Sequence, residues 1–398
     1  MMSMFLATCS SFAQKSELKD LEKAVKKNNT TEAVSLIGQL EKLLPNATED
    51  QTAAYYFYKA QTEISLGNSS KAIETINKLL AFENETKSKK YTTEIMPIKN
   101  DLLAQLVDEA IGFRKNNDFK KSSRLFEQAY KLNTADTLYL FYAASDAVNG
   151  KDFDFAESKY KDLINMNFDG ASDTYVATSQ ITGKVQSFGT DKKARDLAVK
   201  NGTHSKPETE FNKSVKPELY NNLSQILLNK QNYSEAEQYV LKANELDPDN
   251  INTLMNVLFL YYNTNRMNKY EEYANKGLEK FPDNEVLLYN LAVIQLGNGK
   301  TDLAKQHLDK IIKNNPNHFD ALKALGNIEL QKDADVTNRI NALPNTASTD
   351  KKRAELMQEK KTVYENALDY FQKAQKVNAN DEGLNNLIVQ IQSFLKEN

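Results

Sequence analysis

Residues 217–250 read PELYNNLSQILLNKQNYSEAEQYVLKANELDPDN, and this stretch contains the unit from which the fold can be predicted. Apolar residues recur at three- and four-residue spacing in two runs, which predicts two amphipathic helices joined by a short polar turn. The small residues Ala236 and Ala243 in the second run let two antiparallel helices approach closely. Pro248 then ends the second helix, because proline cannot continue one.

The same unit recurs along the chain at a constant interval. Pro248, Pro282 and Pro316 are equally spaced, and four units begin at residues 217, 251, 285 and 319. The pattern resembles the tetratricopeptide repeat (TPR), a helix–turn–helix with a period of about 34 residues. The resemblance implies an all-α solenoid of TPR-type helical hairpins.

The first half of the chain carries weaker copies of this unit. Phe119 and Phe126 are matched one period later by Phe153 and Tyr160, and residues 17–43 predict an initial, degenerate hairpin. Residues 85–100 are expected to form a linker in which Pro97 opens a helix at its first turn.

The last unit is lengthened. The small residue expected at position 338 arrives only at Ala367, so a segment almost as long as one repeat is inserted. Residues 333–361 predict a lengthened antiparallel hairpin that reverses at Pro344-Asn345, each arm gaining about 14 residues or roughly 20 Å. Residues 382–398 predict an amphipathic capping helix, which the end of a solenoid needs.

Residues 171–216 interrupt the period. Residues 174–188 are rich in β-branched residues around Gly183 and predict a β-hairpin. A short helix at 192–200 and a polar loop through Pro207 are expected to follow. Two interpretations stay open: a decayed repeat, or an inserted atypical module that separates two arrays, which we favour.

The order of elements in this module has a counterpart. Together with residues 192–196 (KKARD) and 199–204 (VKNGTH), it is similar to a group of exported bacterial TPR proteins. The resemblance spans nearly the whole mature chain and implies no defined biochemical activity.

The N-terminus indicates export. Residues 4–7 are apolar, and Ser11-Phe12-Ala13 places small residues as before a signal-peptide cleavage site, so residues 1–13 predict a truncated signal peptide. The protein is then expected in the periplasm or at the outer membrane; the alternative is a cytoplasmic protein with an apolar start. Lipidation of Cys9 is a further alternative, although Thr8 departs from the lipobox pattern.

The chain therefore divides into five predicted segments. These are a signal peptide at 1–13, an N-terminal TPR-like array at 14–170, an atypical module at 171–216, a C-terminal TPR array at 217–381 and a capping helix at 382–398.

Composition and motifs argue against several functional classes. The chain has 51 Lys and Arg against 54 Asp and Glu, without the basic excess of a nucleic-acid binder, and no apolar run of membrane-spanning length. Gly299-Lys300-Thr301 matches the end of a phosphate loop, but Ile294 replaces its first glycine. The three histidines lack a second ligand at helical spacing. We predict no cofactor, no metal and no enzymatic activity.

A concave groove is the expected binding surface. The resemblance implies that the fifth, sixth and ninth positions of each unit face it. These positions supply the candidate partner-binding residues Asn221, Asn222, Gln225, Asn256, Phe259, Tyr289, Asn290, Lys323 and Asn327. The three sixth-position amides could bond an extended peptide backbone or, alternatively, support packing between units. With Lys323 the only basic member, a clamp for a peptide carboxylate is not expected.

These observations predict a non-catalytic protein–protein interaction scaffold of the bacterial cell envelope, which binds a protein or peptide partner in the groove. A glycan-binding accessory envelope protein is the alternative, with 19 tyrosines but no tryptophan for stacking on sugars.

Overall fold

The computed structural model describes residues 15–397. Its contacts form two compact units, one ending at Asn232 and the other beginning at Tyr233. The predicted signal peptide and Cys9 lie outside the described residues, and the five segment boundaries stay predictions. Within residues 15–397, none of the helices is both long and apolar enough to cross a membrane.

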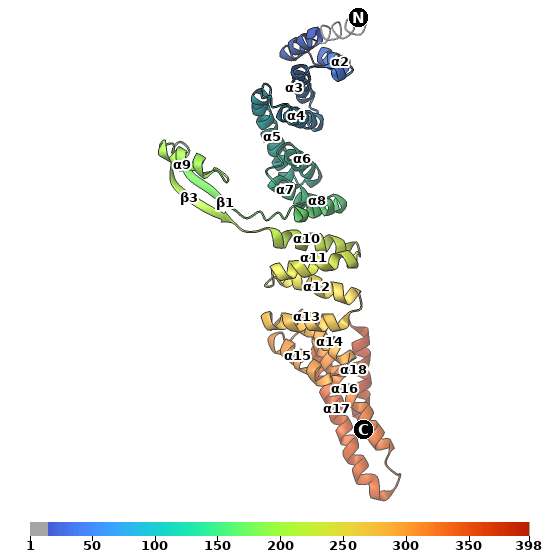
Figure 1. Cartoon of the computed structure of the whole chain (residues 1–398). Coiled ribbons are helices and arrows are strands. Elements are labelled where there is room, and N and C mark those ends of the chain that lie inside the picture. Colours follow the sequence, from blue (N-terminus) through green and yellow to red (C-terminus); the bar gives the residue numbers. More distant parts are fainter. Residues whose placement is uncertain (1–14, 398) are drawn as a thin grey trace. The chain divides into compact units, whose positions relative to one another are not determined.

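The first unit is mostly helical (Figure 1). It contains a helix at residues 15–26, followed by α2 (Thr30–Glu41), the short 3-10 helix η1 (Leu44–Asn46), α3 (Glu49–Ser65), α4 (Ser69–Glu85), α5 (Thr92–Lys115), α6 (Phe119–Leu132), α7 (Leu138–Asn149), α8 (Phe153–Asn165), α9 (Lys192–Lys200) and α10 (Lys216–Asn229). Five of these helices start at polar caps, where a side-chain oxygen accepts a hydrogen bond from a backbone N–H of the first turn: Asn29, Thr48, Asp118, Asp152 and Asp191.

The turns inside the helical hairpins share one backbone feature. In several hairpins, the residue that follows the first helix by two positions has a positive φ. In the first unit this holds at Asn117 and Lys151, and in the second unit at Asn265 and Gly299. The two residues of each pair lie one repeat period apart. The turn therefore repeats even where the residue type does not. Gly299 is such a turn residue between two helices, which explains the glycine in the phosphate-loop-like sequence.

The linker predicted at 85–100 is shorter than expected. Helix α5 already starts at Thr92, so Pro97 lies inside the helix and not in its first turn. The early start has a tertiary cause: the buried carboxylate of Glu83 in α4 accepts hydrogen bonds from the backbone N–H groups of Tyr91 (2.9 Å) and Thr92 (2.6 Å). This carboxylate caps the helix from outside the helix's own sequence.

A three-stranded antiparallel sheet lies between α8 and α10 in the sequence. Its strands are β1 (Ser172–Ser179), β2 (Val185–Ser187) and β3 (His204–Asn212), in the order β2-β1-β3. Figure 1 shows β1 and β3 side by side. The β-hairpin predicted within 174–188 is confirmed. The prediction of a polar loop through Pro207 is wrong, because β3 already begins at His204. Lys206 (φ 48°) and Pro207 stand together opposite Ala177 as a bulge, and the strand's exposed, polar residues lack the alternating apolar pattern that reveals a half-buried strand.

The stacking of helices continues across this insertion. Asn222 in α10 donates a hydrogen bond to the hydroxyl of Tyr160 in α8 (2.9 Å), and Lys230 pairs with Glu157 of α8 (2.7 Å). The two ends of the insertion meet where Val215 N–H donates to the carbonyl oxygen of Asp169 (2.7 Å). The sheet and α9 are thus inserted between two helices that pack directly, and do not interrupt the stack there.

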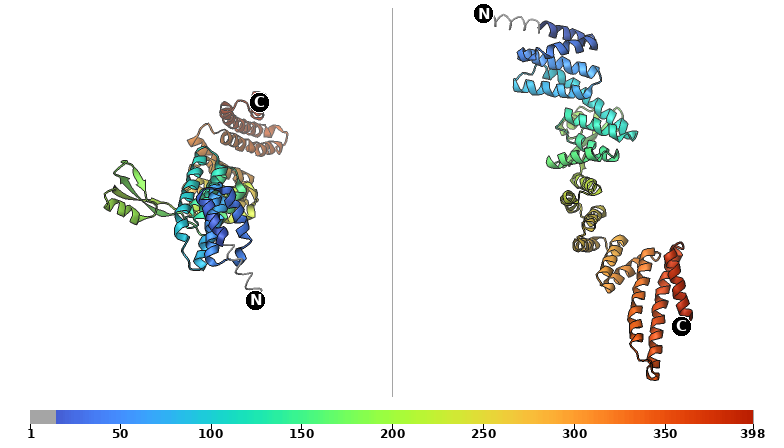
Figure 2. Two further views of the ribbon diagram at one scale, coloured as in Figure 1. Left: turned by 90° about the horizontal axis from the view of Figure 1, so that it is seen from above. Right: turned by 90° about the vertical axis from the view of Figure 1, so that its right-hand side faces the viewer.

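All regular elements of the second unit within residues 233–397 are helices. They are α11 (Tyr233–Leu246), α12 (Ile251–Asn263), α13 (Met267–Lys280), α14 (Glu285–Gly297), α15 (Thr301–Asn314), α16 (Phe319–Asn341), η2 (Ala347–Thr349), α17 (Asp350–Val377) and α18 (Glu382–Glu397). Helices α16 and α17 form the lengthened hairpin, with α18 alongside (Figure 2). The arms are unequal: α16 has 23 residues against 13 in α14, whereas α17 has 28 against 14 in α15. The expected lengthening of about 14 residues per arm is confirmed for α17. Helix α16 is lengthened by less, because residues 342–349 form the turn and not part of the helix.

Candidate functional site

An apolar cleft opens between α12 and α14 in the second unit. It has a volume of about 580 Å³ and is lined by Met255, Leu258, Phe259, Tyr262, Met267, Tyr270, Tyr289, Asn290, Val293 and Ile294. None of these ten residues is acidic, basic or histidine. Side chains from the first helices of two successive repeats form most of the wall, with Met267 and Tyr270 of α13 between them.

Large apolar side chains are exposed at this cleft. The exposed fractions are 47% for Phe259, 65% for Tyr262 and 48% for Val293. Scattered exposed apolar residues are normal on a soluble protein, but clustered ones around a concavity are typical of an interaction site. The gathering of these three around one cleft therefore distinguishes this surface.

A glycine in α13 sets the spacing of the helices around the cleft. A Cβ added at Gly277 would overlap the side chain of Leu254 in α12 and come within 3.1 Å of Leu287 Cδ1 in α14. Both leucines are buried, so neither side chain can move away into solvent. The missing side chain at Gly277 thus lets α13 pack closely against Leu254 of α12 and Leu287 of α14.

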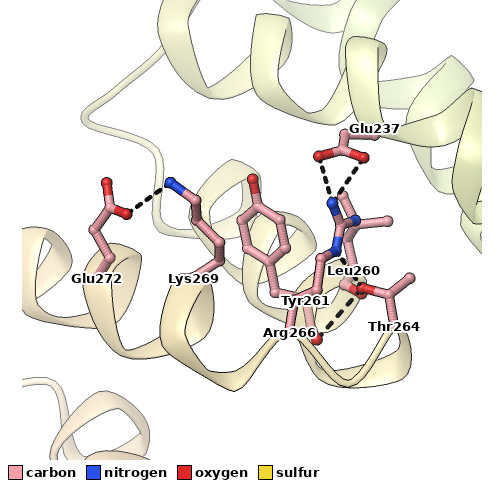
Figure 3. A network of polar contacts seen from close by, with 7 residues as sticks. All are labelled: Glu237, Leu260, Tyr261, Thr264, Arg266, Lys269 and Glu272. Atoms are coloured by element: carbon pink, nitrogen blue, oxygen red, sulfur yellow. Dashed lines mark hydrogen bonds and ion pairs between the residues drawn. The ribbon is translucent and has the colours of Figure 1, made fainter.

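A polar network holds the turn between α12 and α13 (Figure 3). Arg266 Nη1 donates to both carboxylate oxygens of Glu237 in α11 (2.8 and 3.0 Å), and its Nε donates to Thr264 Oγ1 (2.9 Å). The guanidinium carbon lies 4.8 Å from the centroid of the Tyr261 ring, and burial raises the pKa of Tyr261 to about 12. Charge-assisted bonds and ring contact fix Arg266 in place. The network holds the end of α12, which carries Tyr262, and the start of α13, which carries Met267.

Three of the nine predicted groove residues line the cleft: Phe259, Tyr289 and Asn290. Asn290 also hydrogen-bonds Tyr270; burial raises the pKa of Tyr270, and this bond offsets part of the rise. Prediction missed most of the apolar wall, although Met255 and Val293 occupy the fifth and ninth positions that the groove rule selects. Choosing every residue at the fifth, sixth and ninth positions of each unit would have included both, but the prediction selected mainly polar side chains.

The other predicted groove residues lie elsewhere. Lys323 pairs with Asp381 (2.7 Å), beside the start of α18, and its ammonium nitrogen lies 5.0 Å from the centroid of the Phe319 ring. Gln225 and Asn327 are exposed, whereas Asn221 and Asn256 are half-buried. These five residues do not line the cleft.

Asn222 has a packing partner. The hydroxyl of Tyr160, which accepts its hydrogen bond, belongs to a fully buried side chain. Burial raises the pKa of Tyr160, and the bond from Asn222 opposes part of that rise. The contact joins α10, the first helix of one repeat, to α8, the second helix of the preceding repeat. Asn222 thus has the packing role that was the alternative to peptide binding.

Removal of this amide tests its structural role. We expect Asn222→Ala to lower the free energy of unfolding by about 1–2 kcal/mol, because the buried Tyr160 hydroxyl loses its partner. The exposed Gln225→Ala in the same helix should change it by less than about 0.5 kcal/mol. Adding Tyr160→Phe to Asn222→Ala should restore part of the loss. Urea unfolding measures all three, and an unchanged midpoint in Asn222→Ala would contradict the packing role.

No metal-binding group emerges from the described part of the chain: residues 15–397 contain no cluster of three or more His, Cys, Asp or Glu side chains suited to holding an ion. His307 hydrogen-bonds Gln295 (3.0 Å), and burial lowers its pKa. His318 caps α16 and stacks on Tyr289, with ring centroids 5.8 Å apart. Both histidines thus have packing partners.

Two segments of the sequence match models of the tetratricopeptide repeat family, residues 217–250 and residues 271–328. The second segment includes α14 of the cleft and most of α13. No curated protein matches the sequence.

Several solved structures are similar to the chain. One is the C-terminal part of a TPR repeat-containing protein from Cytophaga hutchinsonii, with 15% identity, a TM-score of 0.44 and coverage of 83% of this chain and 99% of that one. Another is a TPR repeats protein from Bacteroides fragilis, with 16% identity, a TM-score of 0.36 and coverage of 65% and 98%. A third is YrrB, described as a TPR protein with an unusual peptide-binding site, with 15% identity, a TM-score of 0.39 and coverage of 59% and 97%.

Proposed function

From the premise that this chain is a tetratricopeptide repeat protein, we propose that it is a protein–protein interaction scaffold whose cleft between α12 and α14 holds an apolar segment of a partner protein. The observation that carries the proposal is the clustering of exposed apolar side chains around one concavity without a charged wall residue.

The chemistry of the wall defines the segment that it fits. Burying an exposed aromatic or aliphatic side chain contributes about 1.5–3 kcal/mol, so two or three such side chains inserted between Phe259, Tyr262 and Val293 would supply most of the affinity. A charged side chain entering the cleft would lose its hydration without a counter-charge. The partner segment should therefore present apolar side chains to the cleft.

Asn290 supplies a polar contact at the same site. A side-chain amide has two donor hydrogens and an acceptor oxygen, so its bond with Tyr270 leaves further capacity. That capacity can bond one backbone group of the segment and fix its position along the cleft. This role combines the two alternatives for the sixth-position amides, packing and recognition, in one residue.

A charge placed in the cleft tests the proposal. We expect Phe259→Asp to weaken capture of the partner from a cell extract at least tenfold, because a carboxylate there prevents burial of the apolar segment. Val389→Asp is the matched control: Val389 is an exposed valine (60%) on α18, away from the cleft, and its replacement adds the same charge. Cross-linking followed by mass spectrometry measures capture, and circular dichroism confirms folding. Equal capture by both variants would refute the cleft as the binding site.

We also propose that the protein is exported to the cell envelope, supported by the apolar residues 4–7 and the small residues Ser11 and Ala13. Cell fractionation and the mass of the mature chain test this. Cleavage before Gln14 with an envelope location would support export, and a lipid adduct on Cys9 would support the anchored alternative. An uncleaved cytoplasmic chain would contradict both.

A further inference from the structure

The outer edge of β3 has backbone groups that no other strand uses. In β1, the N–H and C=O of Tyr175 bond to Gly189 and Phe188, on the β2 side. Because these groups alternate in direction along a strand, those of Thr174 and Val176 point toward β3 and meet Glu210 and Glu208.

The same alternation places the backbone groups of Thr209 and Phe211 on the outer edge of β3. Their N–H and C=O groups make no hydrogen bond to any residue within 15–397. Residues 206–212 are exposed. Helix α9 contacts β3, where Arg195 Nη1 donates to the carbonyl oxygen of Glu208 (2.8 Å), but no hydrogen bond from it reaches the backbone of Thr209 or Phe211. At the other edge of the sheet, β2 has only three residues. An unpaired edge of this kind can accept a further strand.

Side chains along β3 define the strand that would fit. Glu208 and Glu210 project to one face, and neither carboxylate forms an ion pair with the rest of the described chain. Thr209 and Phe211 project to the other face, where Phe211 is 68% exposed. An added strand would place alternate residues beside these two rows. Basic side chains match the glutamate row, and apolar ones match Phe211.

A second copy of the chain fits this edge poorly. Two copies of β3 could pair antiparallel through the outward backbone groups of Thr209 and Phe211. Thr209 of one copy would then lie opposite Phe211 of the other. This pairing places Glu210 directly opposite Glu210 of the other copy, where like charges repel. The bulge at Lys206 and Pro207 also limits the regular edge to residues 208–212. The occupant is thus a short segment of another protein.

We propose that β3 is a second interaction site, at which an extended segment with alternating basic and apolar residues adds to the sheet as a fourth strand. The site is separate from the apolar cleft and does not depend on it. It gives the inserted sheet a function in partner recognition.

Three peptide probes test this with the full chain. One is a capped decapeptide of alternating lysine and valine, the second has the same side chains but N-methylated valines, and the third has glutamate for lysine. We expect the first to slow hydrogen exchange at residues 204–212 and to bind at least tenfold more tightly than the other two. The N-methylated peptide cannot form the edge hydrogen bonds, and the glutamate peptide is repelled.

Two variants locate the contact. The N–H of Thr209 points away from β1, so Thr209→Pro removes a donor at the outer edge without breaking the pairing with β1. Proline is tolerated at such a position on an edge strand. We expect this variant to bind the lysine–valine peptide at least tenfold more weakly. The double variant Glu208→Lys and Glu210→Lys should reverse the preference and favour the glutamate peptide, so the test does not depend on the proline variant folding. Glu365→Gln, an exposed acid on α17, should leave binding unchanged.

Several outcomes would overturn the proposal. These are equal binding of all three peptides, exchange protection outside β3, or lysine–valine binding that survives the charge reversal. A dimer in sedimentation that Thr209→Pro abolishes would instead assign the edge to a second copy. Phe259→Asp should not change peptide binding, so failure of the cleft proposal would remain distinguishable.

Discussion

Replacing Gly326 by alanine is expected to destabilise the long hairpin by about 2 kcal/mol, and Gly326→Val by about 4 kcal/mol. Gly326 is the eighth residue of α16 and faces the fully buried ring of Phe371 in α17. A Cβ there would lie 2.7 Å from Cδ1 and 2.8 Å from Cζ of that ring, and closer still to Cε1. A ring edge cannot bend away as a flexible side chain can, so α16 and α17 must separate. The gain in helix propensity from glycine to alanine, about 1 kcal/mol, offsets only part of this cost.

Thermal unfolding followed by circular dichroism measures the effect. Gly297→Ala is the matched control in the same unit, because a Cβ at that helical glycine would meet no atom within 4 Å. It should leave stability unchanged or raise it slightly. Combining Gly326→Ala with Phe371→Leu should cost less than the sum of the two changes, since the smaller side chain relieves the overlap. Strict additivity would show that the ring contact is not the cause.

Loss of the Glu83 carboxylate is expected to cost about 3 kcal/mol or more in Glu83→Ala, and about 1–2 kcal/mol in Glu83→Gln. The buried carboxylate accepts four hydrogen bonds, from the backbone N–H groups of Tyr91 and Thr92 and from the hydroxyls of Thr92 (2.7 Å) and Ser88 (3.4 Å). Alanine leaves these donors without an acceptor at the start of α5. Glutamine keeps one acceptor oxygen but loses the charge. Urea unfolding measures both, with the exposed Glu85→Gln on the same helix as a control that should change little.

The contribution of Glu83 also depends on pH. Burial raises the pKa of Glu83, but the hydrogen bonds to its carboxylate outweigh burial and leave that pKa below its usual value of 4.5. The folded state therefore favours the ionised form, and the resulting stability is fully present above pH 4.5 and lost as pH falls through the lower folded-state pKa. The stability difference between wild type and Glu83→Gln should be constant near neutral pH and shrink below about pH 4.5. A difference that grew toward acid pH would contradict the assigned direction.

The repeat architecture was predictable from the sequence because it depends on local spacing. The equal spacing of Pro248, Pro282 and Pro316 and the helical spacing of apolar residues are visible without any tertiary information. The lengthened hairpin was likewise visible as a delay in the repeat. Its arm lengths were not, because the position of the turn depends on how α16 and α17 pack.

The candidate site was predictable only in part. The groove rule placed Phe259, Tyr289 and Asn290 correctly on the first helices, and these three line the cleft. It treated Asn222 in the same way, although the structure pairs this amide with Tyr160, which is distant in the sequence. A side chain at a given repeat position can face a cleft or a neighbouring helix, and only the packing of adjacent repeats decides which.

The helical repeat, its period, the place of the insertion and the β-hairpin within it could all be predicted from the amino-acid sequence. Each of these depends on residue type and on spacing along the chain. Four features could be seen only in the folded chain: the start of α5, the third strand β3, the direct packing of α8 on α10 and the apolar cleft. Each of these depends on contacts between residues far apart in sequence: the carboxylate of Glu83 at Thr92, the pairing of β1 with an otherwise polar segment, and the close packing of Gly277 against Leu254 and Leu287. Such contacts follow no fixed spacing along the chain, so the pattern of residue types does not reveal them.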